Sequence, residues 1–100
     1  MSATPYIDIG TLLIRSPDEF GGRPYVAGTG ITVRRIVGWY KLGYEAEEIL
    51  KEIDHLNLAQ VYAALAYFHA NQQAVEDDIA EEEAENRRIE AEHFKAATTP

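Results

Sequence analysis

The sequence predicts a mainly α fold: a three-helix core of the helix-turn-helix type, with a small N-terminal β-hairpin before it and an acidic C-terminal helix after it. Three observations predict this fold. Between residues 31 and 68, apolar residues recur in three stretches at the i, i+3, i+4, i+7 spacing of a helix face. Two short corners separate these stretches, and the composition turns strongly acidic at Glu76. The 100 residues suit one small structural domain.

The charge of the chain is unevenly distributed. The formal net charge is −8, but residues 1–44 carry five basic and three acidic side chains, whereas residues 45–100 carry four basic and fourteen acidic ones. Such a split indicates two surfaces with different partners. The absence of cysteine excludes disulfides and thiolate metal sites. Because there is no secretory pattern and no apolar run long enough to span a bilayer, we expect a cytoplasmic protein without a membrane partner.

Residues 1–30 are predicted to form an N-terminal β-hairpin arm. A short strand over 12–15 ends at Ser16-Pro17, turn formers follow, and a return strand over 23–28 contains Pro24, which confines it to an edge or a strand start. An irregular arm fits the same residues. Gly28 and Gly30 mark a corner where the backbone needs positive φ.

The first two helices of the core, which spans residues 31–74, follow this corner. Thr32 is the expected N-cap of the first, and Gly43 stands where a C-cap glycine belongs. The apolar face of the first helix consists of Val33, Ile36, Val37 and Tyr40. That of the second consists of Ala46, Ile49, Leu50 and Ile53, with glutamates in its first turn, where the helix dipole favours them.

The third helix begins with a capping-box pattern, in which Asn57 is followed three residues later by Gln60. Its apolar stripe consists of Leu58, Val61, Tyr62 and Leu65, and the helix is expected to run to about Gln73. Residues 75–100 form an acidic helix or tail with a thin stripe near heptad spacing: Val75, Ile79, Asn86, Ile89 and His93. Alone, such a helix is marginal, so it is either a frayed tail or a segment that folds on a partner.

The third helix occupies the position of a DNA recognition helix, where Asn57 and Gln60 are candidates to read adenine edges. The candidate phosphate contacts are Arg23, Arg34, Arg35 and Lys41. However, no Arg or Lys occurs between Lys51 and Arg87, and phosphate neutralisation supplies most of non-specific affinity. A packing or dimerisation helix is therefore the alternative, and we expect a homodimer.

Catalytic and metal-binding arrangements are not found. The three histidines at 55, 69 and 93 are too scattered for a metal-ligand spacing, and no nucleophile and base pattern emerges. We expect no enzymatic activity, no metal and no cofactor. Trp39 lies off the main apolar stripe of the first helix, so it packs on the hairpin or lies in a protein interface.

Several motifs resemble the small prokaryotic family named Domain of Unknown Function 433. The run from Gly22 to Val33 (GRPYVAGTGITV) resembles the family pattern G-[KR]-P-x-[IV]-x-G-T-R-I-P-V. Gly43 with Glu47-Glu48-Ile49-Leu50, and the segments 55–58 and 61–67, resemble its later motifs. The sequence departs from the pattern at Gly30, where the family has arginine; at Thr32 and Asp54, where it has proline; and at Glu45, where it has Ser or Thr.

The resemblance implies a homeodomain-like trihelical fold and the role of a VapB-type antitoxin, a protein that neutralises a PIN-like ribonuclease toxin and binds its own operator. On this hypothesis the acidic arm covers the basic groove of a toxin nuclease. The candidate partner-binding residues are Trp39, Ile79, Arg87, Arg88, Ile89 and Phe94. The alternative is a helix-turn-helix transcriptional regulator without a toxin partner, and a purely structural dimer module is a third reading.

Overall fold

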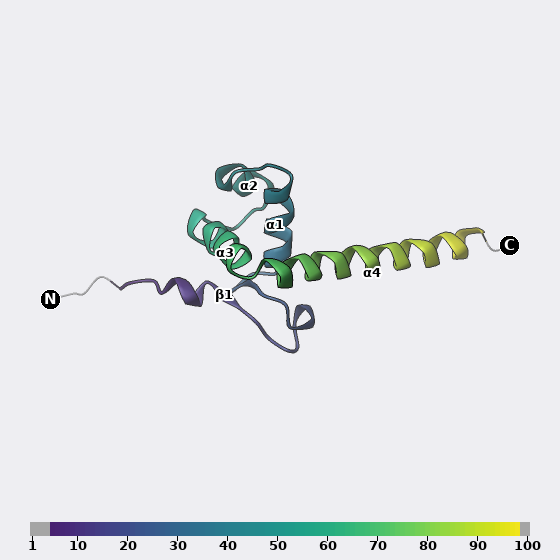
Figure 1. Ribbon diagram of the computed structural model, residues 1–100, viewed down its shortest axis with the longest axis horizontal. Coiled ribbons are helices and arrows are strands. Elements are labelled where there is room, and N and C mark those ends of the chain that lie inside the picture. Colours follow the sequence, from purple (N-terminus) through teal and green to yellow (C-terminus); the bar gives the residue numbers. More distant parts are fainter. Residues whose placement is uncertain (1–4, 99–100) are drawn as a thin grey trace.

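The computed structural model describes residues 5–98, with side chains described through His93. In this range the chain has two short strands, two 3-10 turns and four α-helices, of which three form a compact body and the fourth extends from it (Figure 1). The mainly α prediction is confirmed. None of the helices in the described range is both long and apolar enough to cross a membrane.

The N-terminal arm contains the predicted hairpin. Strand β1 (Leu13–Ile14) pairs antiparallel with β2 (Tyr25–Val26), and Leu13 lies opposite Val26. Between them, the 3-10 turn η2 (Phe20–Gly22) reverses the chain; a first turn, η1 (Ile9–Thr11), precedes β1. Gly28 has a φ of +77° at the predicted corner, a conformation that favours glycine, whereas Gly30 does not adopt positive φ. The hairpin thus brings Val26, which is fully buried, under the helices.

The first two helices of the body are α1 (Val33–Lys41) and α2 (Ala46–Glu52). Thr32 occupies the predicted N-cap position of α1, but its hydroxyl makes no capping hydrogen bond. Gly43 has a φ of +97° just past the end of α1, which confirms the predicted C-cap glycine.

Helix α3 (Leu58–Ala70) begins with the predicted capping box. The Asn57 side chain accepts from the Gln60 N–H at 2.9 Å, and the Gln60 side chain accepts from the Asn57 N–H at 2.7 Å. The helix ends at Ala70, earlier than predicted, because Asn71 leaves the helical region (φ −138°, ψ 46°) and its side-chain amide donates to the Tyr67 carbonyl at 3.1 Å.

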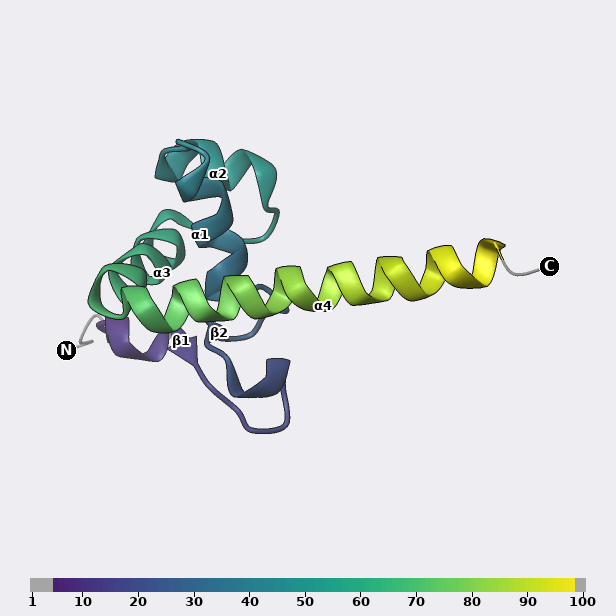
Figure 2. The ribbon, with the colours of Figure 1, turned by 45° about the vertical axis from the view of Figure 1, so that its right-hand side comes forward.

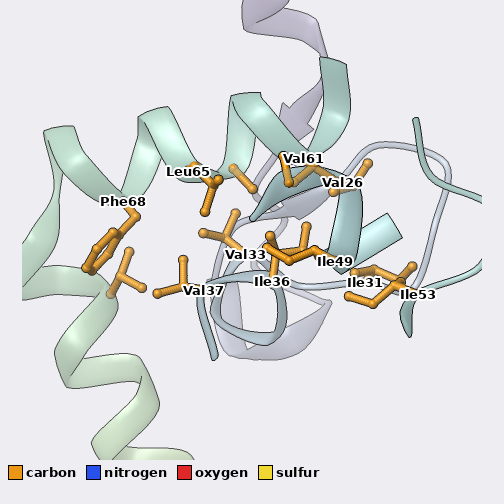
Figure 3. Close-up of a cluster of buried hydrophobic side chains, with 13 residues drawn as sticks. Val26, Ile31, Val33, Ile36, Val37, Ile49, Ile53, Val61, Leu65 and Phe68 are labelled. Atoms are coloured by element: carbon orange, nitrogen blue, oxygen red, sulfur yellow. The ribbon is translucent and has the colours of Figure 1, made fainter. Parts of the chain in front are cut away.

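One hydrophobic core joins the hairpin to all four helices (Figure 3). Its centre is formed by the apolar faces of α1 and α3, with Val33, Ile36, Val37 and Val61 fully buried. The predicted faces of the first two helices supply six of its thirteen buried residues, because the helical spacing places their apolar residues on one side. The predicted stripe of the third helix is only half right: Val61 and Leu65 are buried, but Leu58 and Tyr62 are exposed, and Ala64 and Phe68 face the core instead.

Helix α4 (Gln72–Thr98) has 27 residues and is therefore about 40 Å long. Its first part, the docked half (72–82), packs on the body, since Val75 is only 1% exposed and Ile79 lies against the core. Along the remaining part, the projecting half (83–98), every side chain from Glu83 to His93 is exposed. The projecting half extends beyond the body in two views 45° apart (Figures 1 and 2). The predicted boundary at 74/75 therefore falls inside α4, in a segment that belongs to the core.

Candidate functional site

Three of the four predicted phosphate-binding cations lie under the docked half of α4. Arg34 and Lys41 come from α1, which packs against α4. Arg34 Nε lies 2.9 Å from Glu82 Oε2, and Lys41 Nζ lies 2.6 Å from Glu76 Oε2. The carboxylates of α4 thus occupy the positions beside these cations that phosphate oxygens would take in a nucleic-acid complex.

Arg23, which precedes β2, is the third of these cations. Its Nε lies 3.4 Å from Asp78 Oδ1, and its guanidinium also donates a hydrogen bond to Glu81. This hydrogen bond to Glu81, with the nearby negative charge, raises the pKa of Arg23 above its usual value. The hairpin turn and α4 are therefore joined by a charge-assisted contact that spans 58 residues of sequence.

Every salt bridge among the described residues joins the docked half of α4 to the body. The acidic partners are Glu76, Asp78, Glu81 and Glu82. The sequence predicts them as part of an exposed acidic run. The signal that could have found them is their spacing: they flank Val75 and Ile79, so burying that apolar stripe places them at the edge of the interface. Partly exposed pairs of this kind each contribute about 0.2–1 kcal/mol.

Arg35, the fourth predicted cation, is exposed and forms no ion pair within the described residues. It borders a groove of about 480 Å³ between α1 and α4, which is also lined by Phe20, Glu82 and Glu83. Because Glu82 and Glu83 balance the charges of Arg34 and Arg35 in the lining of this groove, it carries no net positive charge to favour an anionic ligand.

The two amide side chains predicted to read bases already accept hydrogen bonds from backbone N–H groups. Asn57 and Gln60 satisfy each other's main-chain N–H groups in the capping box of α3. A base contact through either side chain would break a capping hydrogen bond, and loss of a cap costs about 1 kcal/mol.

Some of the predicted partner-binding residues pack on the body, and others are exposed on the projecting half. Trp39 is half-buried and packs on Tyr44, with ring centroids 5.0 Å apart, so it stabilises the corner between α1 and α2. Ile79 packs on the core. Arg87, Arg88 and Ile89 lie exposed on the projecting half, and Ile89 is 56% exposed. Phe94 belongs to α4, but its side chain lies outside the described residues.

The histidines are dispersed in the structure as in the sequence. His69 Nε2 lies 3.2 Å from the Tyr40 hydroxyl, on the surface between α3 and α1. Within residues 5–98, no group of three His, Asp or Glu side chains is placed to hold a metal ion.

Residues 14–68, from β1 to near the end of α3, match the family model described as "Protein of unknown function (DUF433)". The chain belongs to the DUF433 family. Its fold is similar to the crystal structure of a DUF433 member protein from Anabaena variabilis ATCC 29413, with a TM-score of 0.64 and 24% sequence identity over 70% of this chain and 69% of that chain. This similarity shows a shared fold. No curated protein matches the sequence. The DUF433 match ends before α4, so the four carboxylates that cover the cations lie outside it.

Proposed function

We propose that this DUF433 protein is an antitoxin-like interaction protein whose projecting half of α4 binds and neutralises a partner toxin, a nuclease of the PIN-like kind in the cytoplasm. It acts by binding and performs no catalysis. The observation that carries this proposal is the exposure of every described side chain from Glu83 to His93 in a helix that continues without interruption from the body.

A helix as short as the projecting half is marginal on its own in water, and packing on a partner is the usual source of helix stability. The docked half has the body of its own chain as a partner, but the projecting half has none among the described residues. Asn86, Ile89 and His93 share one side of it at heptad spacing. A protein that covers this side would stabilise the helix and bury Ile89.

The chemistry of the projecting half fits a nuclease groove. Its exposed glutamates can take the place of RNA phosphates on a basic surface, and Arg87 and Arg88 can pair with the carboxylates that hold a catalytic metal ion. Both features predict that binding is weakened by salt, since exposed charges are screened within about 10 Å at 0.1 M.

The test is a pull-down with the purified product of the adjacent reading frame, using the full chain and a chain that stops after Glu83. Truncation at Val75 is unsuitable because it removes core residues, whereas a stop after Glu83 leaves the docked half intact. We expect the full chain to retain the partner and to inhibit its cleavage of single-stranded RNA, and the shortened chain to lose both. Equal affinity of the two chains would refute the role of the projecting half.

The second candidate is a helix-turn-helix regulator that binds its own promoter without a toxin partner. It is favoured by the trihelical core, with α3 after the second corner, and by the exposed Arg35. It predicts a salt-dependent gel shift of promoter DNA that is lost in the Arg34→Ala, Arg35→Ala double variant. No shift at low salt would eliminate it.

A further inference from the structure

Helix α3 has an exposed face without a single charged carboxylate, ammonium or guanidinium group. The segment Leu58–Ala70 contains no Asp, Glu, Lys or Arg. Its exposed residues fall within roughly 120° of the helix circumference at 3.6 residues per turn. They are Leu58, Ala59, Tyr62, Ala66, His69 and Ala70. Leu58 is 38% and Tyr62 is 53% exposed.

The other helices differ from α3 in this respect. The exposed side chains of α1 include Arg35 and Lys41, those of α2 are mainly Glu and Lys, and those of α4 include several glutamates and two arginines. A helix that is apolar around its circumference is normally buried on all sides, but α3 is covered on one side only.

The apolar surface continues from α3 onto the N-terminal arm. A groove of about 580 Å³ runs between α3 and β1, and its walls are mainly apolar. Ile9 and Ile14 line it and are 69% and 41% exposed. Contiguous exposed apolar surface of this kind marks an interaction site.

We infer that this face of α3 is the surface through which two copies of the chain associate about a two-fold axis. This inference does not depend on the proposed function. Each copy carries a net charge of −8, so most approaches bring like charges together. Glu45 and Glu47 line a groove beside Tyr62 at one edge of this face. The exposed residues of α3 themselves include no carboxylate, so two copies can meet through them without placing a carboxylate in the contact. Conversely, a strongly basic partner finds no acidic group on this face to pair with.

The shape of the face is complementary to itself. The helical spacing places its bulky residues along one edge (Leu58, Tyr62, His69) and its alanines along the other (Ala59, Ala66, Ala70). A two-fold axis that lies in the interface parallel to α3 places the bulky edge of one copy against the alanine edge of the other. The same contacts then form twice. The alanines permit close approach, and tyrosine is favoured at the centre of interfaces.

The arrangement leaves the projecting halves of α4 free. In both views α3 lies on the side of the body away from the projecting half (Figures 1 and 2). Association through α3 therefore buries the helix in the recognition position and leaves the acidic arm of each copy exposed.

The experiment is sedimentation equilibrium on the full chain and two matched variants. Ala66→Glu places a carboxylate on the α3 face, and Ala84→Glu places one at an exposed position of the projecting half. We expect the parent and Ala84→Glu to have twice the chain mass of 11.2 kDa, and Ala66→Glu to dissociate with a Kd raised roughly 100-fold or more. Circular dichroism should show that both variants are folded, since each site is exposed.

Cross-linking locates the interface independently. The chain has no cysteine, so Ala66→Cys and Ala84→Cys each carry one thiol. A short bismaleimide should join two copies of the Ala66→Cys chain and leave the Ala84→Cys chain uncross-linked. A monomeric parent at about 1 mM protein, or a dimer that persists in Ala66→Glu and cross-links only through position 84, would overturn the inference.

Discussion

Converting the docked carboxylates of α4 to amides should uncover the cations of the body and make the protein bind DNA. The variant carries four changes that keep the shape of each side chain: Glu76→Gln, Asp78→Asn, Glu81→Gln and Glu82→Gln. These groups pair with Arg23, Arg34 and Lys41. Because an amide has no charge to neutralise them, the three cations become available to phosphates.

The size of the effect follows from the number of cations released. Binding to duplex DNA changes with salt at a log–log slope of about −0.9 per neutralised phosphate, so three cations predict a slope of about −2.7. Between about 50 and 200 mM salt, that slope corresponds to an affinity loss of about 40-fold.

The assay is fluorescence anisotropy with a labelled DNA duplex of arbitrary sequence, titrated at several salt concentrations. The control variant carries Glu83→Gln, Glu85→Gln, Glu90→Gln and Glu92→Gln, which changes the net charge from −8 by the same four units on the projecting half. If both variants bind with equal affinity and slope, net charge alone explains the result, and the idea that α4 masks the cations is refuted. A folded state in both variants should be verified by circular dichroism.

Three further predictions concern stability and are measured by thermal and urea unfolding. Val75→Ala should cost about 2 kcal/mol, since Val75 is fully buried, whereas Ile89→Ala should cost less than about 0.5 kcal/mol; equal costs would mean that α4 is not docked. Asn57→Ala should cost about 1 kcal/mol through loss of the α3 cap, and an unchanged midpoint would contradict the capping box. Arg23→Ala should destabilise equally at about pH 6 and pH 9. Because pairing raises the pKa of Arg23 in the folded state, the contact stabilises the fold fully at every pH below the unfolded-state pKa of arginine. This stabilisation is lost only when the pH rises through the higher folded-state pKa. A difference in destabilisation between the two pH values would argue against the charged contact.

The local elements of the body were predictable because their signals are local. The capping box at Asn57, the C-cap glycine at Gly43 and the corner at Gly28 each depend on residues within a few positions. The apolar faces of the first two helices follow from the helical period in the same way. The end of α3 was missed because Asn71 stops the helix through its own conformation and a bond to Tyr67, and neither is visible in the hydrophobic pattern.

The candidate site was predictable only in its parts. The arginines of the body and the acidic run of α4 are evident in the sequence, but their pairing depends on where α4 packs. The pair between Arg23 and Glu81 joins residues 58 positions apart, a separation that no local pattern encodes. The same holds for Trp39: the sequence predicts packing on the hairpin or a place in a protein interface, and its contact with Tyr44 at the corner between α1 and α2 is visible only in the tertiary structure.

Taken alone, the sequence determined the type and order of the elements, because helix faces, caps and turns depend on neighbouring residues. Tertiary structure decided which charges meet and which faces remain exposed. An acidic run has the same composition whether it is solvated or paired, and only burial of Val75 brings its carboxylates against the cations of α1 and the hairpin. Likewise, the uncharged helix from Leu58 to Ala70 became a surface only when the core covered one side of it and left the other open.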